Sequence, residues 1–243
     1  MDLSFLWETS VKLLSAVPVT LELFVLSLIF GGLFSIVVLL CRLSENIAIN
    51  GVAKLYLLVF RGTPLMVQLF LIYYGLGQIE WIQESVLWPL LREPFWCAVL
   101  SISLCTAAYT AEIFRGSLLA IPVGQVEAGK AIGMSNLLIA RRIIAPLMLK
   151  HALPAYSTEA IMIVKSTTLA SLVTVWEVTG IAQQIIQRSY RTMEVFICSA
   201  IIYLVINYII IKIYGFIERK LSHDTAKENA ATLSSQNRVC GEG

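Results

Sequence analysis

The sequence contains few charged residues and almost no histidine. Charged residues make up 14% of its 243 positions, compared with about 25% in an average soluble domain. Apolar residues make up 58%, and the mean hydropathy is +0.79. This composition excludes an ordinary soluble globule and an intrinsically disordered chain. The two histidines, His151 and His223, lie in different segments, so the chain offers no histidine-rich metal site.

The sequence also lacks the short motifs that carry catalysis. It has no glycine-rich phosphate loop, no Gly-x-Ser-x-Gly and no His-Glu-x-x-His. Its five cysteines include no Cys-x-x-Cys pair, and four of them lie in or at the ends of apolar runs, where they suit packing. We therefore expect no catalytic site, metal or cofactor in this chain. Any nucleotide that its work consumes must be bound by another protein.

An excess of charge of one sign is missing as well. The sequence contains eighteen basic and sixteen acidic residues, which gives a net charge of +2. A nucleic-acid surface needs clustered Lys and Arg on one face. We therefore expect no nucleic-acid partner.

Long apolar runs are abundant. A membrane-spanning helix needs roughly 20 mostly apolar residues, and five runs of that size are separated by polar or charged clusters. They cover 18–41, 52–76, 95–115, 151–173 and 195–215. The sequence predicts an all-α membrane protein with about five transmembrane helices embedded in a lipid bilayer.

The basic residues are concentrated in alternate loops. The segments after the first, third and fifth runs are rich in Lys and Arg, whereas the other segments hold more acidic residues. Because Lys and Arg accumulate on the cytoplasmic side, we expect the segment 1–17 to be periplasmic and the carboxyl end to be cytoplasmic. A removable signal peptide begins with a basic segment, but Asp2 and Glu8 make this segment acidic, so we expect the first span to be retained. The polar segment 222–243 has no apolar period and predicts a disordered cytoplasmic tail.

Two outer segments combine apolar and polar residues in a way that favours helices lying along the membrane surface. They cover 79–88 and 178–187. Trp81, Trp88 and Trp176 would then lie at the depth of the lipid headgroups.

The cytoplasmic segment 116–150 is longer than ordinary connections between helices. A helix that begins after Pro122 would end at Gly133, because glycine favours the left-handed conformation that terminates helices. A second helix would begin with Ser135 as its cap and continue toward Pro146. The sequence predicts two helices joined by a glycine corner below the membrane.

This segment resembles a known family. Glu-Ala-Gly at 127–129, Gly133 and Ile-Ile-Ala-Pro at 143–146 are similar, in residue type and spacing, to the Glu-Ala-Ala loop of the permeases of binding-protein-dependent ABC importers. Gly129 replaces the second alanine of that loop, and Ala145 replaces a leucine. The resemblance covers residues from about 10 to 221 and implies the fold of a type I ABC importer permease.

Three further stretches resemble the polar amino-acid branch of that family. They are RGTPLMVQ at 61–68, YTAEIFRG at 109–116 and ALPAYSTE at 152–159. Within the branch, the chain is most similar to the M-type permease subunits of histidine/lysine/arginine/ornithine and octopine/nopaline importers.

The resemblance implies a set of partners and a place in the cell. Such a permease pairs with a homologous Q-type permease, two copies of an ATPase that bind ATP and Mg, and a periplasmic solute-binding protein, in the bacterial inner membrane. The loop would be a coupling helix that docks on the ATPase. Ala128, Gly129 and Gly133 would keep its backbone close to the ATPase, and Glu127 would supply a polar anchor.

Ionisable residues inside membrane spans are costly and mark candidate functional positions. Arg61 stands beside Gly62, Thr63 and Pro64, which together indicate a broken helix; it either contacts substrate or packs and reaches the membrane surface. Glu112 and Arg115 are spaced for an i,i+3 ion pair on one helix, and we favour this structural interpretation.

The fourth span carries the deepest charges. Glu159, with Ser157 and Thr158, is the candidate partner for the cationic end of a substrate; the alternative is a buried hydrogen bond that braces the helix. Lys165 either meets a substrate carboxylate or the outer gate, or extends to the outer interface.

The sequence therefore favours the permease subunit of an ATP-driven importer for polar, basic amino acids or opines. The alternative is a secondary transporter, but the five runs show no half-repeat and no cluster of mid-membrane aspartates. A membrane-embedded enzyme would need paired histidines, paired carboxylates or an activated Ser or Cys.

Overall fold

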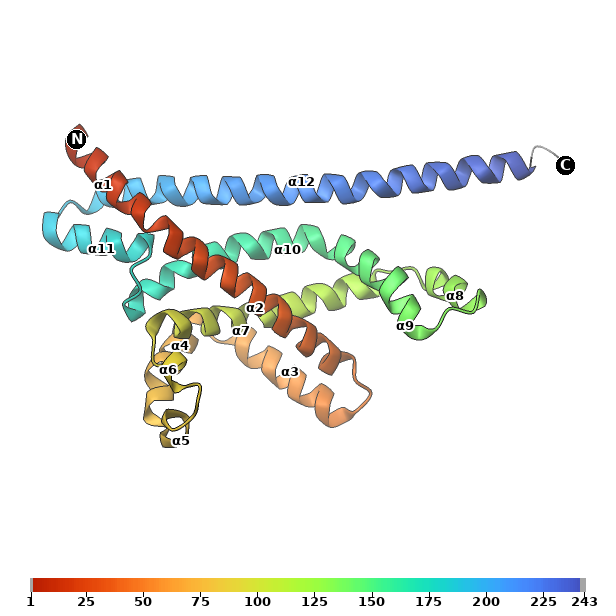
Figure 1. Cartoon of the computed structure of the whole chain (residues 1–243), viewed down its shortest axis with the longest axis horizontal. Helices are drawn as coiled ribbons and strands as arrows, with labels where there is room; N and C mark the ends of the chain where they lie inside the picture. Colours follow the sequence, from red (N-terminus) through yellow and green to blue (C-terminus); the bar gives the residue numbers. More distant parts are fainter. Residues whose placement is uncertain (1, 241–243) are drawn as a thin grey trace.

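The chain forms an elongated bundle of helices (Figure 1). The computed structural model describes residues 2–240, with side chains described through Lys220, and no strand occurs in that part of the chain. The α-helices are α1 (Leu3–Ser15), α2 (Val17–Leu43), α3 (Ile47–Gly62), α4 (Leu65–Phe70), α5 (Glu80–Gln83), α6 (Trp88–Leu91), α7 (Pro94–Leu119), α8 (Val123–Ala131), α9 (Asn136–Ile139), α10 (Ala145–Thr167), α11 (Val178–Ser189) and α12 (Thr192–Cys240). Short π-helical turns are η1 (Leu71–Gly75) and η3 (Ala140–Ile144), and short 3-10 turns are η2 (Leu76–Gln78) and η4 (Thr168–Val173).

Three of these helices are long and apolar enough to cross a membrane. They are α1 together with α2, α7, and the part of α12 up to Lys220. Two bent pairs raise the number to five if each pair is one span: α3 with the segment from α4 to η2, bent by 107°, and the segment from α9 to η4 with α11, bent by 48°. The prediction of an all-α fold with about five spans is confirmed.

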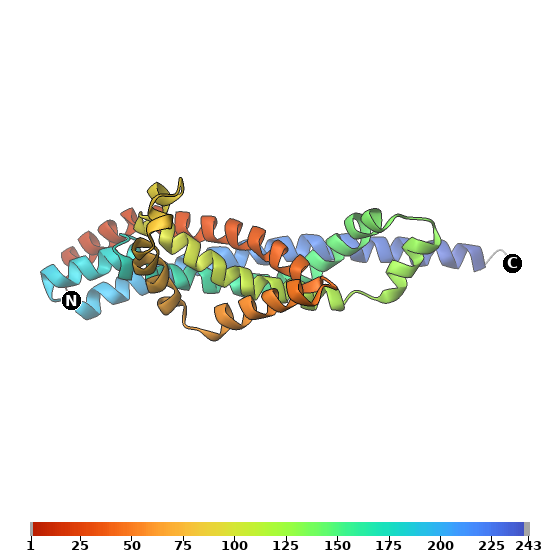
Figure 2. The same ribbon diagram turned by 90° about the horizontal axis from the view of Figure 1, so that it is seen from below.

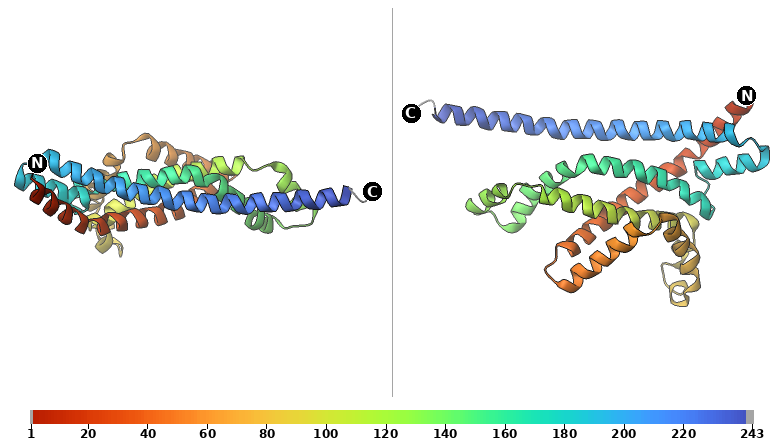
Figure 3. Two further views of the ribbon diagram at one scale, coloured as in Figure 1. Left: turned by 90° about the horizontal axis from the view of Figure 1, so that it is seen from above. Right: turned by 180° about the vertical axis from the view of Figure 1, so that it is seen from behind.

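The centre of the bundle is α7, which packs against α2, α3 and α10. Figure 1 and the rear view in Figure 3 show α7 and α10 lying between α12 on one side and α3 on the other. The buried residues of α7 are mostly small, which lets neighbouring helix backbones approach closely. They include Ala98, Ser101, Ser103, Thr106, Ala107, Ala108, Thr110 and Ala111.

The first span extends further toward the amino terminus than the sequence predicts. Residues 3–15 lie in the segment assigned to an outer terminus, but they form α1, which joins α2 through Ala16. Leu13 on α1 is fully buried and packs in one cluster with Val178 and Val195. Only one face of α1 packs on the bundle, so its sequence mixes polar and apolar residues. A search for long apolar runs therefore does not detect this helix.

The two segments predicted to form helices along the outer membrane surface, 79–88 and 178–187, differ in the structure. The interfacial helix predicted over 178–187 is confirmed as a helix by α11. The single helix predicted over 79–88 is wrong, since the chain forms the one-turn helices α5 and α6 there, separated by a turn. Pro89 explains the second start, because proline suits the first turn of a helix and not its interior.

The end of α12 also differs from the prediction. The helix continues to Cys240, whereas the sequence predicts a disordered tail over 222–243. Residues 216–240 contain no glycine or proline, and their Ala, Glu, Lys and Leu favour a helix. Figure 1 shows this part of α12 extending beyond α8 and α9. The last three positions of the predicted tail, 241–243, lie outside the described residues.

Candidate functional site: the helical corner and the charges within the bundle

The predicted glycine corner is present at one end of the bundle. Figure 2 shows α8 and α9 at the end far from the amino terminus. Gly133 has a φ of +79°, and its N–H donates to the Lys130 carbonyl over 3.0 Å. The N–H of Met134 donates to the Gly129 carbonyl over 3.1 Å. These two bonds form the Schellman arrangement that satisfies the last carbonyls of a helix, and the left-handed residue in it is the position that glycine occupies without strain.

The second helix of the corner begins as predicted. Ser135 is its N-cap, and the side chain accepts a hydrogen bond from the Leu138 N–H over 3.4 Å. From α9 the chain passes through the π-helical turn η3 into α10 without a break in the helical path. The corner is therefore continuous with the membrane helix α10, and Ala120–Pro122 alone separate it from α7.

The four residues predicted to couple to a partner do not all face outward. Glu127, Ala128 and Gly133 are exposed, but Gly129 is buried. A Cβ atom on Gly129 would lie 2.8 Å from Cδ1 of Ile143 and 3.3 Å from Cγ1 of Ile139. Gly129 thus packs α8 against the second half of the same loop, so the interpretation that places it at the partner surface needs correction. The local pattern could not show this, because it does not specify how the two helices fold onto each other.

The corner carries exposed apolar side chains that the sequence pattern alone did not identify. Val123, Ile132 and Leu137 are 70%, 78% and 81% exposed. Large apolar side chains gathered at the surface mark protein or membrane contact sites. These large apolar residues occur in a segment outside the five apolar runs, and this position in the sequence indicates a contact surface.

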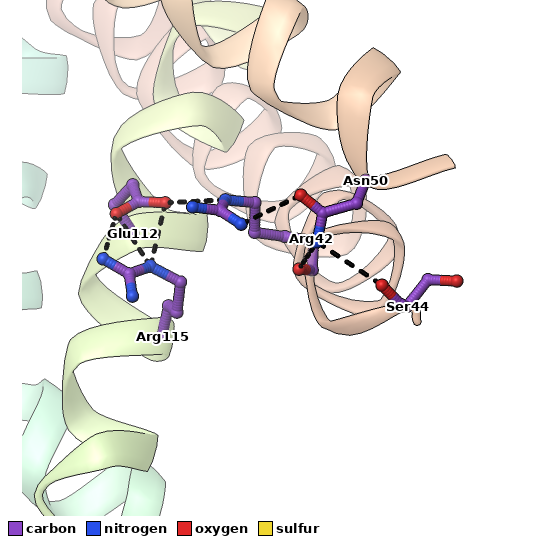
Figure 4. Close-up of polar contacts among 5 residues, drawn as sticks. All are labelled: Arg42, Ser44, Asn50, Glu112 and Arg115. Atoms are coloured by element: carbon purple, nitrogen blue, oxygen red, sulfur yellow. Dashed lines mark hydrogen bonds and ion pairs between the residues drawn. The ribbon is translucent and has the colours of Figure 1, made fainter. Parts of the chain in front are cut away.

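A polar cluster joins three helices at the same end of the bundle (Figure 4). The predicted pair on α7 is confirmed: Arg115 Nε lies 3.1 and 3.0 Å from the two carboxylate oxygens of Glu112, and one terminal nitrogen lies 2.9 Å from Oε2. Arg42 at the end of α2 adds a longer ion pair to Glu112, with Nε 3.8 Å from Oε1. Glu112 therefore links α2 to the helix that leads into the corner.

Asn50 on α3 completes this cluster. Its amide oxygen accepts a hydrogen bond from Arg42 Nη1 over 3.1 Å, and its amide nitrogen donates to the Arg42 carbonyl over 2.6 Å and to the Ser44 carbonyl over 3.4 Å (Figure 4). Asn50 thereby satisfies carbonyls at the end of α2 and fixes the α2–α3 turn. The arrangement is a structural brace near the corner.

The broken helix predicted around Gly62, Thr63 and Pro64 is confirmed. The chain ends α3 at Gly62 and begins α4 at Leu65, and the bend exposes carbonyls inside an apolar region. The buried side chain of Gln68 donates to the Phe60 carbonyl over 3.0 Å and to the Thr63 carbonyl over 3.1 Å. A broken membrane helix requires such substitute donors and acceptors. Gln68 therefore stabilises the break in the helix, a role that we did not predict for it. The signal in the sequence is a glutamine within an apolar run.

The structure places one of the predicted pathway residues, Arg61, against an aromatic ring. The guanidinium carbon of Arg61 lies 5.2 Å from the ring centroid of Tyr109 on α7, in a cation–π contact. Glu159, the second charged residue predicted for the pathway, is half-buried on α10. The two groups form no direct ion pair among the described residues. Arg61 on α3 and Glu159 on α10 therefore keep separate charges.

The other predicted pathway residues lie on α10. Lys165 is exposed on α10 and belongs to none of the five ion pairs in the described part of the chain. The Ser157 hydroxyl donates to the Pro154 carbonyl over 2.7 Å, so its hydrogen serves its own helix. Thr158 is exposed beside it. Among the residues whose side chains the structure describes, no group of three or more His, Cys, Asp or Glu could hold a metal ion.

Comparison with known proteins assigns the family. Residues 29–223 match the family described as "Binding-protein-dependent transport system inner membrane component". The chain belongs to this family. As a member it is a transmembrane component of a transport system, and the match covers the brace, the broken helix, the corner and the three charged pathway residues.

Individual relatives agree with this assignment. The chain is 47% identical over 217 residues to the octopine transport system permease protein OccM of Rhizobium radiobacter, covering 89% of both chains. It is 37% identical over 226 residues to the histidine/lysine/arginine/ornithine transport system permease protein HisM of Salmonella typhimurium, covering 92% of this chain and 96% of HisM. A crystal structure of an amino acid ABC transporter with histidines superposes with a TM-score of 0.79 at 31% identity, covering 90% of this chain and 99% of that one. These findings support an ABC importer permease over a secondary transporter.

Proposed function

We propose that this chain is the permease subunit of an ATP-driven importer that moves basic amino acids or opines across the bacterial inner membrane. The observation that carries the proposal is the α8–α9 corner, which joins two membrane helices and presents exposed apolar residues beside Glu127. The names of the relatives OccM and HisM support the substrate class.

The corner is suited to receive force from an ATPase. Val123, Ile132 and Leu137 supply apolar contacts, and Glu127 and Ala128 stand exposed on α8. Gly133 fixes the angle between the two helices, and Gly129 packs them into one unit. A rigid unit that is continuous with α10 and three residues from α7 can pass a movement of the partner to both membrane helices.

The partners in this proposal are an ATPase dimer, which binds the ATP and Mg, a homologous Q-type permease and a periplasmic solute-binding protein. The end that carries α8 and α9 faces the cytoplasm, and the amino terminus faces the periplasm. This orientation is supported by the basic residues concentrated near the corner, such as Arg115, Lys130, Arg141 and Arg142.

The substrate pathway in this proposal passes Arg61 and Glu159. A carboxylate in a poorly hydrated cavity binds a guanidinium or ammonium strongly. A basic amino acid carries both a cation for Glu159 and a carboxylate for Arg61, so the separated charges match the two ends of the substrate. Ser157, Thr158 and Lys165 flank this region on α10 as further candidates.

The test is the ATPase activity of the reconstituted complex. This chain, its partner permease and the ATPase are assembled with the binding protein, which is loaded in turn with arginine, histidine, lysine, ornithine and octopine. Stimulation by one loaded binding protein establishes the importer and identifies the substrate. A fully assembled complex that responds to none of them would contradict the proposed substrate class.

A further inference from the structure

A buried carboxylate outside the site described above lies at the opposite end of the bundle. Glu177 stands between η4 and α11 and has no solvent exposure. Figure 1 shows α11 at the end of the bundle away from α8 and α9. None of the five ion pairs in the described residues includes Glu177. Its carboxylate is therefore held by hydrogen bonds and not by a cation.

Three donors converge on the Glu177 carboxylate. The backbone N–H groups of Thr179 and Gly180 each donate over 2.9 Å, and the hydroxyl of Tyr203 on α12 donates over 2.6 Å. The Tyr203 hydroxyl also lies 3.0 Å from the Thr179 hydroxyl. The carboxylate thus caps the positive end of α11 and ties it to α12.

The same end of α11 is fixed to α2. The N–H of Val178 donates to the hydroxyl oxygen of the buried Thr20 over 3.2 Å. A Cβ atom on Gly180 would lie 2.6 Å from the carbonyl oxygen of Val175, so the turn leaves no room for a side chain there. One turn of α11 is therefore bound to two membrane helices that are distant in the sequence.

Both ends of α11 adjoin residues with left-handed backbone conformation. Thr174 has a φ of 65° and Tyr190 a φ of 59°, and these are the two non-glycine residues with positive φ in the described part of the chain. A β-branched residue in this conformation is strained, and such strain persists only where surrounding contacts hold it. The contacts that hold Thr174 are the bonds that close η4: the N–H of Thr174 donates to the Ser171 carbonyl over 3.3 Å, and the N–H of Val175 donates to the Ala170 carbonyl over 3.2 Å. The two left-handed residues thus mark the corners at which the chain enters and leaves α11.

We infer that Glu177 is a positioning residue that latches α11 to α12, and that α11 turns about Thr174 and Tyr190 when the outer end of the permease opens. The inference rests on the proposed function. Release breaks the hydrogen bond from Tyr203 and the bond from the Val178 N–H to Thr20, while the carboxylate keeps the N–H groups of Thr179 and Gly180 and moves with α11. A loaded binding protein that docks on the outer end supplies the free energy for this release.

Hydrogen exchange of the assembled complex tests the latch. Tyr203→Phe removes the hydroxyl and retains the ring, and Tyr208→Phe is the matched control, because Tyr208 lies on the same helix but is 56% exposed. A hydrogen bond to a charged group is worth about tenfold or more in an equilibrium. We expect Tyr203→Phe to raise amide exchange in 178–182 and ATP hydrolysis without binding protein by about tenfold, and Tyr208→Phe to change neither. Glu177→Gln should act in the same direction as Tyr203→Phe.

The wild-type complex provides a second measurement that does not depend on any variant folding. Loaded binding protein with ATP should raise amide exchange in 178–182. If the wild-type ATPase is stimulated but exchange in 178–182 does not change, the latch is overturned while the proposed function stands. The latch is also overturned if Tyr203→Phe raises exchange but leaves the ATPase dependent on binding protein as in wild type, since Glu177 is then only a packing residue. Absence of stimulation in the wild-type complex marks failure of the proposed function instead.

Discussion

Gly129 lies so close to Ile143 that a Cβ atom on Gly129 would stand 2.8 Å from Cδ1 of that isoleucine. The contact packs α8 onto the π-helical turn that leads into α10. The corner therefore has an internal core of its own, and its outward face is formed by other residues. This division between internal and outward residues determines which substitutions should affect stability and which should affect docking.

Gly129→Ala should be tolerated. The nearest atom is the flexible end of the Ile143 side chain, which can shift, and alanine favours a helix over glycine by up to about 1 kcal/mol. Gly129→Leu should destabilise the corner by about 1–3 kcal/mol through overpacking. Thermal unfolding of the purified complex measures both, and equal stability of the alanine and leucine variants would contradict the packing seen here.

Gly133→Val should uncouple the transporter. A β-branched residue at a φ of +79° is strained by about 1–3 kcal/mol, so the angle between α8 and α9 changes. Gly124→Val is the control, since Gly124 lies within α8 and a Cβ atom there meets nothing within 4 Å. We expect Gly133→Val to insert into the membrane but to lose ATP-driven uptake, with Gly124→Val active. Normal uptake by both variants would exclude a role for the corner geometry.

Leu137→Asp should weaken binding of the ATPase without unfolding the permease. Leu137 is 81% exposed, so its replacement removes little internal packing, and substitutions at exposed positions are usually within about 0.5 kcal/mol. Glu127→Ala should act in the same direction by removing the polar anchor. Asn136→Asp, at an exposed neighbouring position, controls for added charge. Copurification of the ATPase with tagged permease measures the effect, and unchanged recovery with both Leu137→Asp and Glu127→Ala would rule out this face as the docking surface.

Gln68→Leu should destabilise the permease at the broken helix. The change removes the amide donor from the Thr63 carbonyl and leaves the Phe60 carbonyl with only the longer contact from the Cys105 thiol, at 3.8 Å. A carbonyl left unpaired away from water costs about 1–3 kcal/mol. Gln78→Leu is the control, because Gln78 is exposed at the end of η2. Thermal unfolding in detergent should show a lower midpoint for Gln68→Leu alone. Equal midpoints would mean that other groups satisfy the break.

The sequence predicts those features that depend on local pattern. The Gly133 stop, the Ser135 cap, the Glu112–Arg115 pair and the break after Gly62 each follow from spacing along one segment, and each is confirmed. Family resemblance supplies the expectations about the coupling residues, and the cost of charges inside membrane spans supplies those about the pathway residues.

The features that the sequence does not predict depend on contacts between segments. Nothing in the local pattern around Gln68 shows that a bend of 107° brings its amide to the freed carbonyls. Glu177 and Tyr203 are 26 residues apart, and their hydrogen bond exists only because α11 folds back along α12. The outward role predicted for Gly129 is wrong for the same reason. Its contact with Ile143 forms only when the second half of the loop folds onto the first, and the local pattern does not show that folding.

Glu159→Gln should impair transport of basic substrates. The change keeps the size of the side chain and removes the charge of this half-buried carboxylate. Loss of one charge-assisted contact of about 1.5–3 kcal/mol corresponds to a tenfold or larger rise in the half-saturating substrate concentration. Glu22→Gln on the exposed side of α2 is the matched control. Uptake kinetics of labelled arginine and octopine measure the effect, and equal kinetics for both variants and wild type would remove Glu159 from the pathway.

The central claim is that this permease imports solute by means of an ATPase docked on α8 and α9. Uptake of a labelled basic amino acid or opine into proteoliposomes, with the energy source varied, tests it most directly. The account predicts uptake that requires ATP, the ATPase and loaded binding protein, and that persists when proton and sodium gradients are collapsed. Uptake by this chain without the ATPase, driven by such a gradient, would contradict the account.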